Sequence, residues 1–179
     1  HPADLLAVAP TDHRSPADPR EVLARLLDGS RFEEFEPAAG GGLCTGWGTI
    51  HGYRTAVVAD RARPPGPAEC ARAARFVRLV ADGPVPLVGL WSGGRPPTAG
   101  PAASTQHLMD VIARAPVPRL AVHLGPAPAD GDRPRFQFSW PTSAGFRGAA
   151  PSYDAGQSDD DGTIDPRDTR TVLGLCLAV

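Results

Sequence analysis

Residues 85–91, VPLVGLW, most constrain the fold, because seven consecutive residues carry no charged side chain. The run is too short for a buried helix and is typical of a strand that is covered on both faces. Helical patterns precede and follow it, over 68–81 and 104–115. A strand placed between helices predicts a mixed α/β core with this strand near the centre of the sheet.

Local signals predict the other elements. Asp18 is placed to cap a helix that has Pro19 in its first turn and ends at Gly29. Gly52 is expected to form a tight turn between two strands. The remaining expected elements are strands over 43–51, 53–59, 119–124 and 135–140, and a closing helix over 165–178 capped by Asp165.

The 179 residues are expected to form one domain over 18–179, preceded by a loose N-terminal arm over 1–17. A net charge of −2 gives no reason to expect nucleic acid or an acidic membrane surface as a partner. The chain has no apolar run of the roughly 20 residues that span a bilayer. Its first residues lack the pattern of a signal peptide, so we expect a cytoplasmic protein.

Two residue types limit the chemistry. All 18 basic residues are arginines, which excludes a Schiff-base lysine and a phosphate-binding loop lysine. The three cysteines Cys44, Cys70 and Cys176 lack the spacing of metal ligands, and we expect buried, reduced thiols. No other constellation of metal ligands is present, and the acidic run Asp159–Asp161 is interpreted as a solvated loop.

Five stretches, in order, resemble the C-terminal half of the carboxyltransferase (β) subunit of acyl-CoA carboxylases. They are DPREVLARLLDGSRFEEFEP, TGWGTIHGYRTAVVAD, ARAARFVRLV…VPLVGLW, FSWPT and IDPRDTRTVLGLCLA, which together span residues 18–178. The resemblance implies a crotonase-like fold, a single-domain α/β superhelical core built from strand–strand–helix units. It also implies an oxyanion hole, in which backbone N–H groups hold the oxygen of a thioester or of carboxybiotin.

The sequence departs from that family at two loops. Where the family reads V-D-x-P-G-F, this chain reads WSGGRP over 91–96, and where the family reads R-K-x-x-G-G-A-Y it reads GPAPADGD over 125–132. The family's Gly-Gly-Ala cradle for carboxybiotin is thereby replaced by Ala129, Asp130 and Gly131. The strand ending at Leu124 is expected to lead into a short connecting loop in place of the family's helix. A helical stretch before IDPRDTR and the family's N-terminal half are also without counterpart, so we expect no biotin and no other cofactor.

The resemblance therefore implies a carboxyltransferase-like protein that acts on an acyl thioester, on CoA or on a carrier protein. Its reaction is expected to be redirected to decarboxylation, hydrolysis or cyclisation in a biosynthetic pathway. The alternative is a non-catalytic subunit or scaffold of a carboxylase or biosynthetic complex. We favour the enzyme, because a scaffold has less need of a glycine-rich loop after a buried strand. A homo-oligomer, or a hetero-complex with a related subunit, is expected because the family buries large surfaces between its halves.

The candidate site begins at the end of the central strand. Gly93 and Gly94 are expected to present backbone amides to a thioester carbonyl, with Trp91 and Ser92 beside the substrate. Arg95 is expected to meet a carboxylate or phosphate of the substrate. An ordinary glycine–proline loop is the alternative interpretation of this segment.

Three further residues are candidates. His123, in the strand beside the altered loop over 127–132, is either a general base or a hydrogen-bonded, half-buried histidine. His107 and Asp110, three residues apart on an expected helix, are candidates for substrate binding as an acid–base pair. A solvent-exposed pair on that helix is the alternative.

Overall fold

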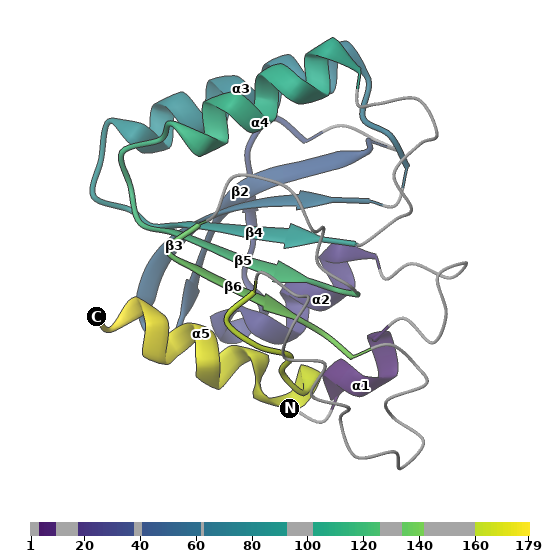
Figure 1. The fold of residues 1–179 in the computed structure, drawn as a ribbon. Coiled ribbons are helices and arrows are strands. Elements are labelled where there is room, and N and C mark those ends of the chain that lie inside the picture. The colour runs from purple at the N-terminus through teal and green to yellow at the C-terminus, as the bar shows by residue number, and fades with distance from the viewer. Residues whose placement is uncertain are drawn as a thin grey trace.

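Six strands lie side by side in chain order in one mixed sheet, which helices cover on both faces (Figure 1). The computed structural model describes residues 4–9, 18–37, 41–61, 63–92, 102–125, 134–141 and 160–179. The strands are β1 (Glu33–Glu34), β2 (Leu43–Ile50), β3 (Tyr53–Asp60), β4 (Leu87–Trp91), β5 (Arg119–His123) and β6 (Phe136–Ser139). The helices are α1 (Leu5–Val8), α2 (Pro19–Leu26), α3 (Pro67–Ala81), α4 (Ala103–Ala113) and α5 (Thr169–Leu177).

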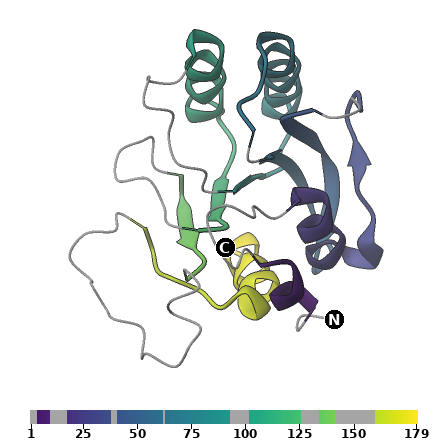
Figure 2. The same ribbon diagram turned by 90° about the vertical axis from the view of Figure 1, so that its right-hand side faces the viewer.

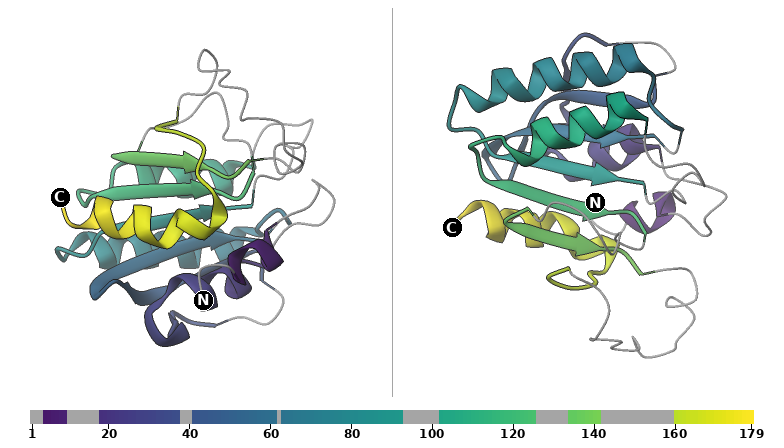
Figure 3. Two further views of the ribbon diagram at one scale, coloured as in Figure 1. Left: turned by 90° about the horizontal axis from the view of Figure 1, so that it is seen from below. Right: turned by 45° about the horizontal axis from the view of Figure 1, so that its top comes forward.

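Strand β4 lies inside the sheet, as the VPLVGLW run predicts. It pairs in parallel with β3 on one side and with β5 on the other. Helices α3 and α4 lie on one face of the sheet, and α1, α2 and α5 lie on the opposite face (Figures 2 and 3). Both faces of β4 are thus covered, which explains why an uninterrupted apolar run is stable there.

The core divides into layers on the two faces of the sheet. Ala56 and Val58 of β3 belong to a cluster with side chains of α3, whereas Val57 and Ala59 belong to a cluster with side chains of α2 and α5. This division follows the two-residue period of a strand. The order of parallel strands β3 to β6 brings their carboxyl ends to one edge of the sheet.

Strands β2 and β3 form the expected hairpin. Its turn residues His51 and Gly52 both have positive φ, 50° and 83°, which is the conformation of a type I′ turn. The expected cap of α2 is also present, because Asp18 Oδ1 accepts a hydrogen bond of 3.0 Å from the Arg20 amide. The helix ends at Leu26, earlier than expected, and Gly29 lies with φ 60° in the following 3-10 turn η2 (Asp28–Ser30).

Three parts of the chain differ from expectation. Helix α1 lies within the expected loose arm, yet its Leu5 is fully buried in the core. The two-residue strand β1 is too short to produce a sequence pattern. The closing helix is split, because Asp165 caps a 3-10 turn, η3 (Pro166–Asp168), through the Arg167 amide, and α5 follows that turn. None of the helices in the described ranges has the length and apolarity needed to cross a bilayer.

Candidate functional site

Four strands end in one row at the carboxyl edge of the sheet. Trp91 is the register partner of His123, and His123 is the register partner of Ser139. Each is the last residue of its strand, as Asp60 is the last residue of β3. Ligands of parallel α/β sheets bind outside the carboxyl ends of the strands, so this row is the candidate site.

The Trp91 indole lies back along its own strand. A side chain added at Gly89 would place Cβ 2.7 Å from Trp91 Nε1, so the indole fills the space that a larger residue at 89 would need. Trp91 packs against the cluster on the α3 side of the sheet. The indole is therefore held beside Gly89, and the expected contact with a substrate stays a prediction.

His123 is more deeply buried than the sequence suggests, with 7% of its surface exposed. Burial lowers the pKa of its imidazole to about 4, although the charge of Asp160 acts in the opposite direction. The imidazole is therefore neutral near pH 7 and weak as a general base. A neutral imidazole still has one N–H that can donate a hydrogen bond to a developing oxyanion.

Asp60 is a site residue that sequence reasoning missed. Its carboxylate Oδ1 accepts a hydrogen bond of 2.5 Å from the Ser92 amide, between the ends of neighbouring parallel strands. Burial raises the pKa of Asp60, and the Ser92 amide opposes that rise. The available signal was an acidic residue at the end of an apolar strand, YRTAVVAD.

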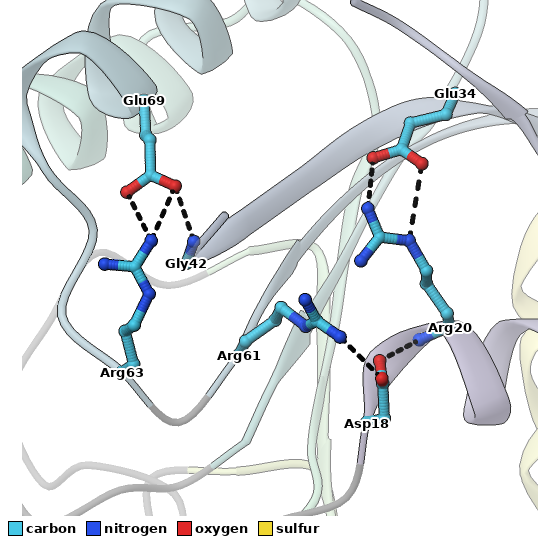
Figure 4. A network of polar contacts seen from close by, with 7 residues as sticks. All are labelled: Asp18, Arg20, Glu34, Gly42, Arg61, Arg63 and Glu69. Carbon is cyan, nitrogen blue, oxygen red and sulfur yellow. Dashed lines mark hydrogen bonds and ion pairs between the residues drawn. The ribbon is translucent and has the colours of Figure 1, made fainter. Parts of the chain in front are cut away.

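The connection after Asp60 is fixed by a polar network (Figure 4). Its three ion pairs are Arg61 with Asp18 at 2.6 Å, Arg20 with Glu34 at 2.6 Å and Arg63 with Glu69 at 3.0 Å. Glu69 also accepts a hydrogen bond of 2.6 Å from the Gly42 amide. The network joins the first residues of α2 and α3 to the sheet. It thereby fixes the backbone that follows Asp60 at the carboxyl end of β3.

Two carboxylates of the acidic run over 159–161 also bind β6. Ser139 Oγ donates a hydrogen bond of 2.6 Å to Asp160, and the Gln137 amide donates one of 2.7 Å to Asp161. Asp160 is only half-buried and Asp161 is exposed, as expected of a solvated loop, and Asp159 lies outside the described residues. The interpretation misses that Asp160 and Asp161 also bind β6. Within the described residues, no cluster of three or more potential metal ligands occurs.

Some of the remaining candidates cannot be placed. Gly93, Gly94 and Arg95 lie outside the described residues, as does the loop over 127–132, so their expected roles stay predictions.

His107 and Asp110 are both exposed on α4 and contact different residues. His107 Nε2 lies 3.2 Å from Arg78 Nη2, and Asp110 accepts a hydrogen bond of 3.0 Å from Gln106. They line a hollow of about 280 Å³ between α3 and α4 rather than the row of strand ends. The structure therefore does not bring them together with His123, and the alternative of an exposed helix pair describes them better.

Two thiols are buried as expected. Cys44 and Cys70 are 2% exposed, whereas Cys176 is only partly buried. Burial raises the pKa of the Cys44 thiol to about 12, so this residue is unreactive near neutral pH.

Comparison with known proteins gives a consistent result. Residues 1–122 match the family described as carboxyl transferase domain. A probable biotin-dependent acyl-coenzyme A carboxylase beta2 subunit of Mycobacterium tuberculosis is 29% identical over 98% of this chain and 44% of the relative. The mitochondrial methylcrotonoyl-CoA carboxylase beta chain of Arabidopsis thaliana is 27% identical over 98% of this chain and 39% of the relative.

A solved structure has the same fold. The beta subunit of P. aeruginosa geranyl-CoA carboxylase superposes with a TM-score of 0.75 and 25% identity, over 99% of this chain and 44% of that one. The chain thus spans less than half the length of these relatives. The alignment with the Mycobacterium tuberculosis subunit runs over 232 residues, so the relative has segments without counterpart in these 179 residues. The chain belongs to the carboxyl transferase domain family and has the crotonase-like fold of its β subunits.

Proposed function

We propose that this chain binds an acyl thioester, on CoA or on a carrier protein, at the carboxyl edge of β3–β6 and decarboxylates it without biotin. The observation that carries the proposal is the position of His123, buried and neutral, in the row of strand ends next to Trp91. Ser92, which follows Trp91, directly precedes Gly93 and Gly94 in the sequence. Relatives named as acyl-CoA carboxylases support an acyl thioester as the ligand.

Decarboxylation fits the site better than hydrolysis or cyclisation does. Both of those reactions need a base to activate a nucleophile, and a histidine with a pKa near 4 is a poor one. In decarboxylation the bond from the α-carbon to the carboxylate breaks, and its electron pair moves into an enolate as CO₂ leaves. A proton from water then adds to the α-carbon. The enolate oxygen needs hydrogen-bond donors, which the His123 N–H and the amides of Gly93 and Gly94 would supply.

The proposal is tested with malonyl-CoA, whose carboxylate lies on the α-carbon. Calorimetry should detect binding of malonyl-CoA, and mass spectrometry should detect acetyl-CoA as the product. His123→Ala should reduce turnover by about 100-fold, the order expected for loss of one oxyanion donor. Gly94→Val should block the approach of the thioester to the loop. His51→Ala, which removes an exposed histidine at the β2–β3 turn, is the matched control and should retain turnover.

The second candidate is a non-catalytic subunit of a carboxylase or biosynthetic complex, which would self-associate or bind a related subunit. It is favoured by the sequence GPAPADGD over 125–132, in which Ala129, Asp130 and Gly131 replace the Gly-Gly-Ala cradle of the family that the chain resembles. Binding of malonyl-CoA without any product would select this candidate. If the wild-type chain neither binds nor converts the thioester, the proposed function is wrong.

A further inference from the structure

We propose that the hollow between α3 and α4 binds a small aliphatic carboxylate, whose chain lies against an apolar lining and whose charge is held by Arg78 and Arg114. The two helices lie side by side on one face of the sheet (Figures 1 and 2). The hollow of about 280 Å³ lies between their C-terminal halves, and the structure describes all of its lining residues. This site is separate from the row of strand ends, and the proposal does not depend on the proposed function.

Most of the lining of the hollow is apolar. It includes Val77 and Ala81 of α3, Val111 of α4, and Ala115 and Pro116, which follow α4. Val77 is fully buried, whereas Val111 and Ala115 are only half-buried. A hydrocarbon chain placed here would remove apolar surface of both partners from water, which favours binding. The volume lies at the lower limit of ligand pockets, about 300–1,000 Å³, so the ligand must be small.

Arg78 contributes a guanidinium whose charge no carboxylate neutralises. Its Nη2 lies 3.2 Å from His107 Nε2 on the neighbouring helix. Because a guanidinium only donates hydrogen bonds, the imidazole accepts through Nε2, which requires a neutral ring with its proton on Nδ1. Arg75, one turn earlier on α3, is instead paired with Glu36. His107 therefore holds Arg78 beside the hollow without removing its positive charge.

Arg114 supplies the second guanidinium. It lies at the C-cap of α4, four residues after Asp110, a spacing at which opposite charges commonly pair. Asp110 instead accepts a hydrogen bond of 3.0 Å from Gln106. Among the described residues, neither Arg114 nor Arg78 forms an ion pair with a carboxylate. Two positive charges and one negative charge therefore line an apolar hollow, which favours a ligand with an anionic end and an apolar body.

The ligand carboxylate must contact the two guanidinia directly. Asp110 and the carbonyls at the ends of both helices carry negative charge and oppose an anion that approaches the helix ends. A guanidinium binds a carboxylate through parallel N–H donors, and such a contact is stronger than a hydrogen bond between neutral groups. An alcohol of the same chain length lacks this contact, and acetate lacks the chain. These two compounds therefore separate the two parts of the site.

The test titrates the labelled wild-type protein with hexanoate and follows its amide resonances by two-dimensional NMR. We expect the amides of Val77 and Val111 to shift, with a dissociation constant on the order of 1 mM. Hexanol and acetate should each bind at least about 5-fold more weakly at these amides. Raising the salt concentration from about 0.05 M to about 0.5 M should weaken the binding of hexanoate but not that of hexanol.

Variants that remove one charge assign the contact to particular side chains. Arg78→Gln and Arg114→Gln should each weaken hexanoate binding by about 3-fold, which is within the range of an exposed ion pair. Asp110→Asn keeps an acceptor for Gln106 and removes the opposing charge, so it should strengthen binding by about 2-fold. Arg167→Gln, which removes an exposed guanidinium next to α5 on the opposite face of the sheet, is the matched control and should bind like the wild type.

Each outcome decides the proposal. Preferential binding of hexanoate at α3 and α4, weakened by loss of either arginine, supports it. Equal binding of hexanol and hexanoate, or unchanged binding in both arginine variants, overturns it, because the arginines would then hold no charge of the ligand. The wild-type titrations are sufficient if a variant does not fold.

The place of the shifts separates this proposal from the proposed function. Shifts confined to the amides of Trp91 and His123 overturn the site between the helices and leave the proposed function intact. Absence of any shift at about 50 times the expected dissociation constant overturns the site as well. Turnover of malonyl-CoA is measured separately, so either proposal can fail alone.

Discussion

Asp28 and Arg170 form an ion pair of 2.5 Å although 142 residues separate them in the chain. The same carboxylate accepts hydrogen bonds from the amides of His51, at 3.1 Å, and Gly52, at 2.7 Å. One side chain thereby joins the end of α2, the β2–β3 turn and α5. These three elements lie on or beside the face of the sheet opposite α3 and α4 (Figure 3).

Replacement of Asp28 by alanine should therefore destabilise the fold. It leaves two backbone amides and one guanidinium without their acceptor, and we expect a loss of about 2–3 kcal/mol in the free energy of unfolding. Urea denaturation measures this loss. Asp82→Ala, at an exposed carboxylate, should change stability by less than about 0.5 kcal/mol. Equal urea midpoints for Asp28→Ala and the wild type would show that the ion pair contributes nothing.

Asp28 should also make the free energy of unfolding depend on pH. Burial alone would raise its pKa, but the Gly52 amide, Arg170 and the His51 amide together hold the pKa below its usual 3.8. The folded state therefore keeps this carboxylate charged at lower pH than the unfolded state does. Its contribution is complete above about pH 4 and is lost as pH falls through the folded pKa. The difference in stability between wild type and Asp28→Asn should accordingly shrink as pH falls below about 4.

Gly174 allows α5 to approach the β2–β3 turn. A Cβ at this position would lie 2.5 Å from His51 Cδ2, so Gly174→Ala requires the His51 ring, the turn or the helix to move. Alanine favours a helix by about 1 kcal/mol over glycine, yet we expect a net destabilisation of about 1 kcal/mol, because the His51 ring must leave its position. The double variant His51→Ala/Gly174→Ala should recover most of the loss. A single variant as stable as the wild type would contradict the close contact.

Much of the fold could be predicted because its signals are local. The Asp18–Pro19 start of α2, the turn at Gly52 and the apolar run of β4 each depend on neighbouring residues, and each is present in the structure. Helix α1 and strand β1 were not predicted. The position of Leu5 in the core and the pairing of Glu33 with Trp47 depend on contacts distant in sequence.

The candidate site was less predictable for the same reason. His123 was recognised as a strand-end histidine, but its burial depends on how neighbouring strands and helices pack around it. Asp60 becomes part of the site only through Ser92, 32 residues later in the chain. His107 and Asp110 have helical spacing that predicts proximity, yet Arg78 from another helix and Gln106 on the same helix are their partners.

The cysteines should differ in their reaction with iodoacetamide. Cys176 is partly exposed, whereas Cys44 is buried and its pKa is raised to about 12 by burial. Alkylation requires a thiolate that the reagent can reach. We expect the native protein to be modified first at Cys176, with Cys44 and Cys70 modified only after unfolding, as measured by mass spectrometry of the peptides. Rapid labelling of Cys44 in the folded protein would contradict its buried position.

His123 should make the protein less stable in mild acid. Its folded pKa of about 4 lies below the unfolded value of 6.5, so the unfolded state binds more protons between these values. The contribution of the neutral, buried imidazole is therefore complete above about pH 6.5 and decreases as pH falls toward about 4. The decrease is at most about 1.4 kcal/mol per pH unit for one group.

Replacement by glutamine isolates this effect, because glutamine does not titrate. Urea denaturation at about pH 7 and about pH 5 should show a smaller loss of stability in His123→Gln than in the wild type. His107→Gln replaces an exposed histidine on α4 and controls for the removal of one imidazole. Asp60, whose raised pKa makes the folded state bind more protons in acid, acts in the opposite direction but is present in all three proteins. The same acid loss in wild type and His123→Gln would mean that the imidazole is not buried in its neutral form at the strand end, and the proposed oxyanion donor would then lose its physical basis.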